Sequence, residues 1–185
     1  MVSFLNRFRK SKVKEEAVDK SSEGAPGIEA AVALELTRIA GDLYKVLDAN
    51  SMRKSAFHVK DAPYIIDDAV SREYIVQVYS TEDPWLGDVL VDGASTSTKD
   101  AENQAWVALT TLQVATGKIS KIWKEQFASK KIKYAEISSV GVSDNGVLTI
   151  ESPAGKIEVA FAPDTDQEVL IALKGFMEGR GKQST

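Results

Sequence analysis

The chain has 185 residues, 43% hydrophobic and 27% charged, which is enough apolar material for one large or two small domains with a real core. It has no cysteine, which excludes disulfides and thiolate metal sites, and its single histidine disfavours histidine-based metal sites and Ser-His-Asp catalysis. The net charge is −4, but the first 14 residues carry five basic side chains and no acid, so the other residues together carry a charge of −9. An acidic body of this kind argues against nonspecific binding of nucleic acid over the whole surface.

Residues 1–27 are predicted to form a flexible basic segment and linker, because residues 9–27 are charged, contain Ser, Gly and Pro, and have almost no large apolar side chains. The opening MVSFLNRF mixes apolar and basic residues. It could lie on an anionic membrane, dock into a partner's groove or serve as a solubilising tail, and all three remain open. The candidate anchors are Phe4, Leu5 and Phe8, and the candidate contacts to an anionic partner are Arg7, Arg9, Lys10, Lys12 and Lys14.

From residue 28, apolar residues at three- and four-residue spacing predict a helix of roughly 18–20 residues that ends near Asn50. Alternating and β-branched residues then predict three strands, over residues 55–70, 72–81 and 87–94. Trp85 lies in a proline-containing loop before the third of these strands and is the candidate exposed aromatic anchor.

Residues 98–115 are predicted to form a helix with Ser97 as its cap. One face of this helix would be formed by Ala101, Ala105, Ala108, Leu109 and Leu112. Residues 28–116 would thus form an αβββα unit. The stretch GDVLVDGASTSTKDAENQAWVALTTL resembles the end of the double-stranded RNA-binding domain, where a strand runs into an alanine-rich helix. In that family lysines at the start of this helix contact phosphate, whereas the corresponding positions here are Thr98, Lys99 and Glu102.

Gly117 is predicted to end that helix, and residues 119–129 to form a basic linking helix. Further candidate contacts to an anionic partner are Lys118, Lys121, Lys124, Lys130, Lys131 and Lys133. Three strands, over residues 132–143, 146–152 and 156–162, should follow, with turns at 144–146 and 153–155. A last helix should begin near Asp164 and fray through Gly179 and Gly181. Residues 117–185 would thus combine a basic helix with a three-stranded antiparallel sheet and a C-terminal helix, and the fold class of the whole chain is α+β.

The stretch KIKYAEISSVGVSDNGVLTIESPAGKIEVAF resembles the second half of bacterial pleckstrin-homology-like (PH-like) domains. The resemblance implies that residues 164–178 form the C-terminal helix that plugs an open barrel end. It also requires earlier strands, which either come from residues 56–94, giving one continuous structure, or are missing. Domains of this kind bind proteins or lipid headgroups.

No thiol nucleophile, glycine-rich phosphate loop or calcium loop occurs in the sequence. We therefore predict a non-enzymatic binding or adaptor protein that acts through protein–protein contacts, without a cofactor or metal. One alternative is an RNA- or ribosome-associated protein that uses residues 118–133 and the basic N-terminus. Another is a peripheral membrane protein. With no apolar run of about 20 residues, a cytoplasmic location is expected, and a membrane-peripheral one is the alternative.

Overall fold

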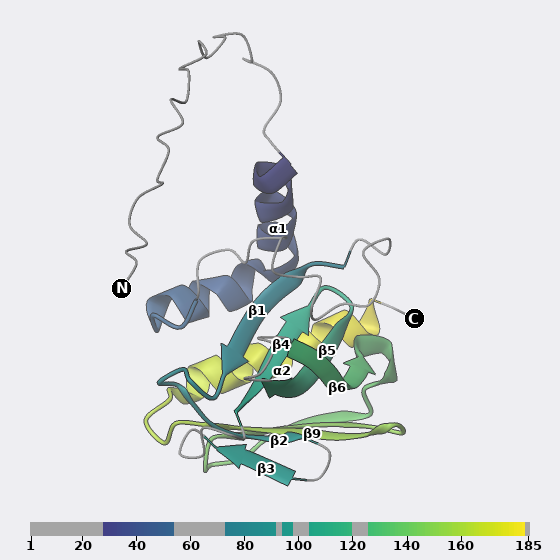
Figure 1. Cartoon of the computed structure of the whole chain (residues 1–185). Coiled ribbons are helices and arrows are strands. Elements are labelled where there is room, and N and C mark those ends of the chain that lie inside the picture. The colour runs from purple at the N-terminus through teal and green to yellow at the C-terminus, as the bar shows by residue number, and fades with distance from the viewer. Residues whose placement is uncertain (1–27, 54–72, 92–93, 98–103, 120–125, 184–185) are drawn as a thin grey trace, which may run out of the picture.

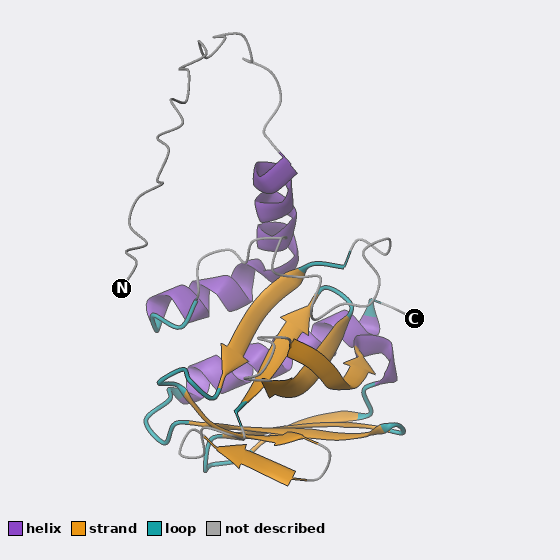
Figure 2. Ribbon diagram, in the orientation of Figure 1, coloured by secondary structure: helices purple, strands orange, loops and turns teal. Residues whose placement is uncertain are grey.

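The computed structural model describes residues 28–53, 73–91, 94–97, 104–119 and 126–183. The predicted basic segment 1–27, the predicted strand over residues 55–70, Lys121 and Lys124 lie outside these ranges. Figure 2 shows the two helices and the strands that make up the described part.

The predicted first helix is confirmed as α1, Ile28–Ala49, which is bent in the middle. Ala40 leaves helical geometry (φ −119°, ψ 17°) beside Gly41, a residue type at which helices often kink. The half after the bend is buried through Leu43, Tyr44 and Leu47, and the Tyr44 hydroxyl donates to the Val76 carbonyl oxygen at 3.1 Å. The half before the bend projects away from the body (Figure 1).

The described strands form two antiparallel sheets. The four-stranded sheet has the order β1–β4–β5–β6, formed by Ile75–Ser80, Ala105–Thr110, Gln113–Ile119 and Gln126–Lys133. The five-stranded sheet has the order β3–β2–β9–β8–β7, formed by Ala94–Ser97, Leu86–Val91, Gly155–Phe161, Val147–Ser152 and Ser139–Val142.

The chain crosses from one sheet to the other at residues 81–85, and this corner holds the sheets together. Thr81 bonds Ala105 twice, because its N–H donates to the Ala105 carbonyl at 2.8 Å and its hydroxyl accepts from the Ala105 N–H at 3.0 Å. On the other sheet, the N–H of Ala162, just after β9, donates to the Trp85 carbonyl at 2.7 Å. β1 and β2 follow one another along the chain, and each belongs to a different sheet.

The predicted last helix is confirmed as α2, Gln167–Lys182. Asp166 caps it by accepting from the Glu168 N–H at 2.9 Å. Its apolar side packs into a core shared with both sheets, to which it contributes Val169, Leu170, Leu173 and Met177, each at most 1% exposed. The predicted fraying at Gly179 and Gly181 is wrong, since the helix continues to Lys182.

The predicted helix over residues 98–115 is wrong where the chain is described. Residues 105–110 form β4, which is buried along its whole length, and residues 113–119 form β5. A strand between two neighbours with both faces covered is apolar throughout, so its alanines and leucines also fit a helical spacing. Residues 98–103 lie outside the described part.

The predicted basic helix over residues 119–129 is wrong at both described ends. Ile119 closes β5, and residues 126–129 begin β6, which pairs antiparallel with β5. The predicted strand over residues 132–143 is interrupted, because Tyr134–Glu136 form a 3-10 turn, η2, between β6 and β7. The division placed between residues 116 and 117 falls inside β5.

These corrections bear on the two resemblances. The resemblance to the double-stranded RNA-binding domain is not supported, because its second helix is replaced by β4 and β5. In the C-terminal unit the chain has the three antiparallel strands and terminal helix that the PH-like resemblance implies. That resemblance left open whether the earlier strands come from residues 56–94 or are missing. β2, within this range, pairs with β9, so the two parts of the chain form one continuous structure.

Candidate functional site

A groove of about 430 Å³ runs between β7 and the last turns of α2. Its apolar lining comes from Ile137 and Val140 on one side and Met177 on the other. Val140 and Met177 are buried, and Ile137 is half-buried. Two polar helix residues, Glu178 and Lys182, flank the apolar strip. The groove thus offers an apolar floor with charged groups along one wall.

The position of α2 in this groove depends on close packing at its end. A side chain at Gly181 would bring a Cβ within 3.0 Å of the Tyr134 carbonyl oxygen, so glycine permits the helix to approach η2. The Tyr134 ring packs edge-on against Phe176, with ring centroids 5.8 Å apart. Its hydroxyl donates to the Thr110 carbonyl at 2.8 Å. The end of α2 is therefore fixed to η2 and to the β4–β5 turn.

Arg180 adds a second tie, because its Nη2 donates to the Thr111 carbonyl at 2.6 Å. Burial raises the pKa of the Tyr134 hydroxyl far above its usual value, with the nearby Arg180 charge acting in the opposite direction. Tyr134 is thus a neutral hydrogen-bond donor at physiological pH. The rear wall of the groove is held by these hydrogen bonds and carries no ionised phenol.

β7 forms an edge of the five-stranded sheet and pairs with β8 alone among the described strands. The backbone N–H of Ser143 donates to the Val147 carbonyl at 2.9 Å, so these two residues form a hydrogen-bonded pair. Every second pair before it is also hydrogen-bonded, and the backbone groups of Gly141 and Ser139 therefore point toward β8. Backbone groups alternate along an antiparallel ladder. The N–H and C=O groups of Val140 and Val142 therefore point away from β8, along the open edge.

β7 differs in charge from β6, one of the two edge strands of the other sheet. β7 reads SVGV and has no charged residue, whereas β6 carries Lys130, Lys131 and Lys133. Charged side chains on an edge strand, lysine above all, discourage the addition of another strand. By this criterion β7 is open to strand addition and β6 is not.

The described lysines among the predicted contacts do not form one patch. The Lys130 ammonium donates to the Lys156 carbonyl at 3.0 Å, which directs it to the β8–β9 turn of the other sheet. Lys118 pairs with Phe127 and Lys133 with Gln113, five residues apart along β5, or roughly 16 Å. Both Lys118 and Lys133 are exposed, and Lys131 is half-buried.

Trp85, the candidate exposed anchor, is half-buried and packs against the core beside the corner between the sheets. The other candidate anchors, Phe4, Leu5 and Phe8, and the basic residues between positions 7 and 14 lie outside the described residues. The groove residues were not singled out as a site from the sequence. The glycines near the end of the last helix could have pointed to this groove, since a glycine inside a helix often marks a place of close packing.

Within the described residues, no three His, Asp or Glu side chains gather in a way that could hold a metal ion. No helix in that same part of the chain is long and apolar enough to cross a membrane.

Comparison with protein-family profiles finds no match, and comparison with curated proteins finds none either. Among solved structures, the N-terminal PH domain of human ARAP2 is similar to this chain at 16% identity, over 58% of this chain and 82% of that chain, with a TM-score of 0.40. A structure of the Vav1 exchange factor with its PH and C1 domains matches at 9% identity, over 83% of this chain and 36% of that chain, with a TM-score of 0.34. Both likenesses are loose, and the fold of this chain is defined by its own strand order and pairing.

Proposed function

We propose that the chain is a non-enzymatic binding module whose β7–α2 groove takes an extended segment of a partner protein as an added strand. The observation that carries this proposal is an uncharged edge strand directly beside an apolar groove. Strand addition is a recurrent mode of peptide recognition, in which backbone bonds supply affinity and side-chain pockets supply specificity.

The available groups define what the partner segment should look like. The outward backbone groups of Val140 and Val142 offer roughly four hydrogen bonds, each contributing about 0.5–1.5 kcal/mol net. One apolar side chain of the bound segment would enter between Ile137, Val140 and Met177. Glu178, which is ion-paired with Lys174 at 3.8 Å, and Lys182 line the groove beside this apolar strip, so the bound segment should be polar on either side of its apolar side chain.

A peptide library displayed on phage and selected on the full chain tests this proposal. Selected peptides should bind the chain, and Val142→Pro should weaken binding at least about tenfold, because proline removes an outward N–H. The matched control is Val142→Thr, which keeps the N–H and a β-branched shape and should bind within about threefold of the parent. Equal binding by all three proteins would overturn the proposal.

Contacts between Lys118, Lys131 or Lys133 and an anionic partner remain a separate proposal. Anionic phospholipid vesicles and duplex RNA, titrated against the full chain in rising salt, test it. Binding that falls steeply with salt and is lost when these lysines become glutamate would support it. Binding of vesicles or RNA without any selectable peptide would favour that function over peptide recognition.

A further inference from the structure

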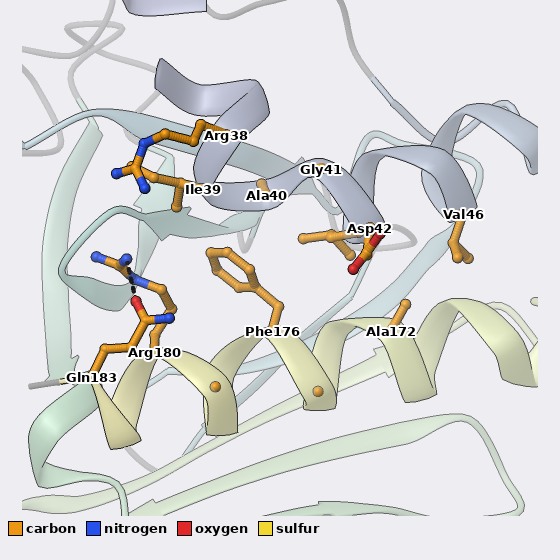
Figure 3. Close-up of a pocket in the computed structure, with 13 residues that line it drawn as sticks. Arg38, Ile39, Ala40, Gly41, Asp42, Val46, Ala172, Phe176, Arg180 and Gln183 are labelled. Carbon is orange, nitrogen blue, oxygen red and sulfur yellow. Dashed lines mark hydrogen bonds between the residues drawn. The ribbon is translucent and has the colours of Figure 1, made fainter. Parts of the chain in front are cut away.

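A second groove, of about 550 Å³, lies between α1 after its bend and α2 (Figure 3). The two helices run in opposite directions along it, so that Arg38 lies near Arg180 and Gln183 at one end while Val46 lies near Ala172 at the other. Phe176 projects from α2 toward α1 in the middle. This groove uses the opposite side of α2 from the β7 groove.

Glycines keep the floor of this groove low. Gly41 on α1 and Gly175 and Gly179 on α2 all line it, and a Cβ built at any of the three meets no atom within 4 Å. A glycine inside a helix costs roughly 0.5–1 kcal/mol relative to alanine. Three of them bordering one open space leave room for the close approach of another backbone.

Exposed apolar side chains extend the groove at both ends. Leu34 is 74% exposed and Ile171 is 62% exposed, the two highest values among large hydrophobic residues in the described part of the chain. Residues four apart lie on the same face of a helix. Leu34 therefore lies one turn before Arg38, and Ile171 one turn before Gly175, so that an apolar residue adjoins each end of the groove.

The same chain presents a helix suited to this space. The half of α1 before the bend rises from the body (Figure 1). Its Leu36 is buried in the core, whereas Ala30, Ala31, Ala33 and Leu34 are exposed. A helix of this length is marginal in water without packing partners. Its small side chains match the glycine floor, and it carries Glu35, while the near end of the groove carries Arg38 and Arg180.

We propose that the α1–α2 groove is a homodimer interface, in which the exposed face of residues 30–38 of each copy packs against the groove of the other. Such a contact is isologous, since each copy supplies both the helix and the groove. In this arrangement Glu35 of one copy can exchange its Arg38 contacts, at 2.7 and 2.9 Å within one chain, for the arginines of its partner. Leu34 of the two copies would meet near the twofold axis.

Sedimentation velocity of the full chain over a concentration series tests the proposal. Because the contact belongs at the small end of specific interfaces, the dimer should be weak, and the average sedimentation coefficient should rise from the monomer value as the concentration passes through roughly tens of micromolar. Leu34→Asp should weaken dimerisation at least about tenfold by placing a charge in the apolar contact. Ala154→Asp, which adds the same charge on the exposed β8–β9 turn, should leave it unchanged.

Two further variants separate loss of the interface from loss of the fold. Gly175→Leu should abolish the dimer by filling the groove, while its melting temperature stays equal or rises, because leucine is a better helix former than glycine. The natural chain has no cysteine, so Leu34→Cys introduces a unique thiol that should give a disulfide-linked dimer on oxidation, whereas Ala154→Cys should not.

A chain that stays monomeric at several hundred micromolar (about tenfold above that concentration range) overturns the proposal. So does a dimer that survives both Leu34→Asp and Gly175→Leu. A dimer lost with Val142→Pro and kept with Leu34→Asp would place self-association at β7 instead, and would count against the α1–α2 interface.

Discussion

Two buried tyrosines differ in what their hydroxyl groups contact. The Tyr134 hydroxyl donates to the Thr110 carbonyl, whereas the Tyr79 hydroxyl is buried and has no hydrogen-bond partner among the described residues. Tyr134→Phe should therefore destabilise the chain by about 1–2 kcal/mol, because it strands a buried acceptor. Tyr79→Phe should be neutral or stabilising. Chemical unfolding of the two variants checks the pair, and equal losses would contradict the hydrogen-bond assignment.

The same burial predicts a loss of stability at alkaline pH. Desolvation raises the pKa of both hydroxyls above the unfolded value of about 10. Their contribution is fully present below pH ~10 and is lost as pH rises toward the folded pKa values. Tyr79→Phe removes one such group without removing a hydrogen bond. Its stability should fall less steeply than that of the parent above pH ~10 in unfolding titrations, and identical slopes would count against this cause.

At the level of single residues, strand alternation was the most useful sequence signal. It favoured Leu148 and Ile150 over Val147 for the core, and the structure confirms this, with the first two at 2% and 0% exposure and Val147 half-buried. Leu112 was expected to be buried on a helix and is 47% exposed, because it lies in the turn between β4 and β5. Whether a side chain is buried depends on the helix, strand or turn to which it belongs. A wrong prediction of that element therefore also gives a wrong prediction of burial.

The glycines of α2 make opposite predictions for the same substitution. Gly175→Ala should stabilise the chain by about 0.5–1 kcal/mol, since nothing lies within 4 Å of its Cβ and alanine favours the helix. Gly181→Ala should destabilise it, because the added carbon comes within 3.0 Å of the Tyr134 carbonyl oxygen. Melting temperatures of the two variants check this. A gain at both positions would mean that α2 is not closely packed on η2.

Elements with local signals were predictable and those without were not. The β8–β9 hairpin was marked by a Pro-Ala-Gly turn at residues 153–155 and by clean alternation, and α2 by its apolar spacing. For residues 105–110 the local signal was ambiguous, because a buried central strand and a buried helix segment have the same apolar composition. The deciding factor is pairing with β1, whose residues lie about 30 positions earlier in the chain.

At the scale of the whole molecule, the α+β class could be predicted but the arrangement of the strands could not. The sequence contains no local sign that β2 turns the corner at residues 81–85 to pair with β9. The β7–α2 groove arises from that arrangement, since it joins an edge strand with a helix more than 20 residues later. Composition alone excluded disulfides and thiolate metal sites, whereas the candidate groove could be found only from the three-dimensional arrangement of β7 and α2.

Amide hydrogen exchange at β7, with and without a selected peptide, tests the proposed strand addition most directly. The N–H groups of Val140 and Val142 point to the open edge and should exchange at least about tenfold more slowly when peptide is bound. The Gly141 N–H, which already points to β8, should change little. Protection confined to another edge, or no change at Val140 and Val142 with peptide bound, would contradict strand addition at β7.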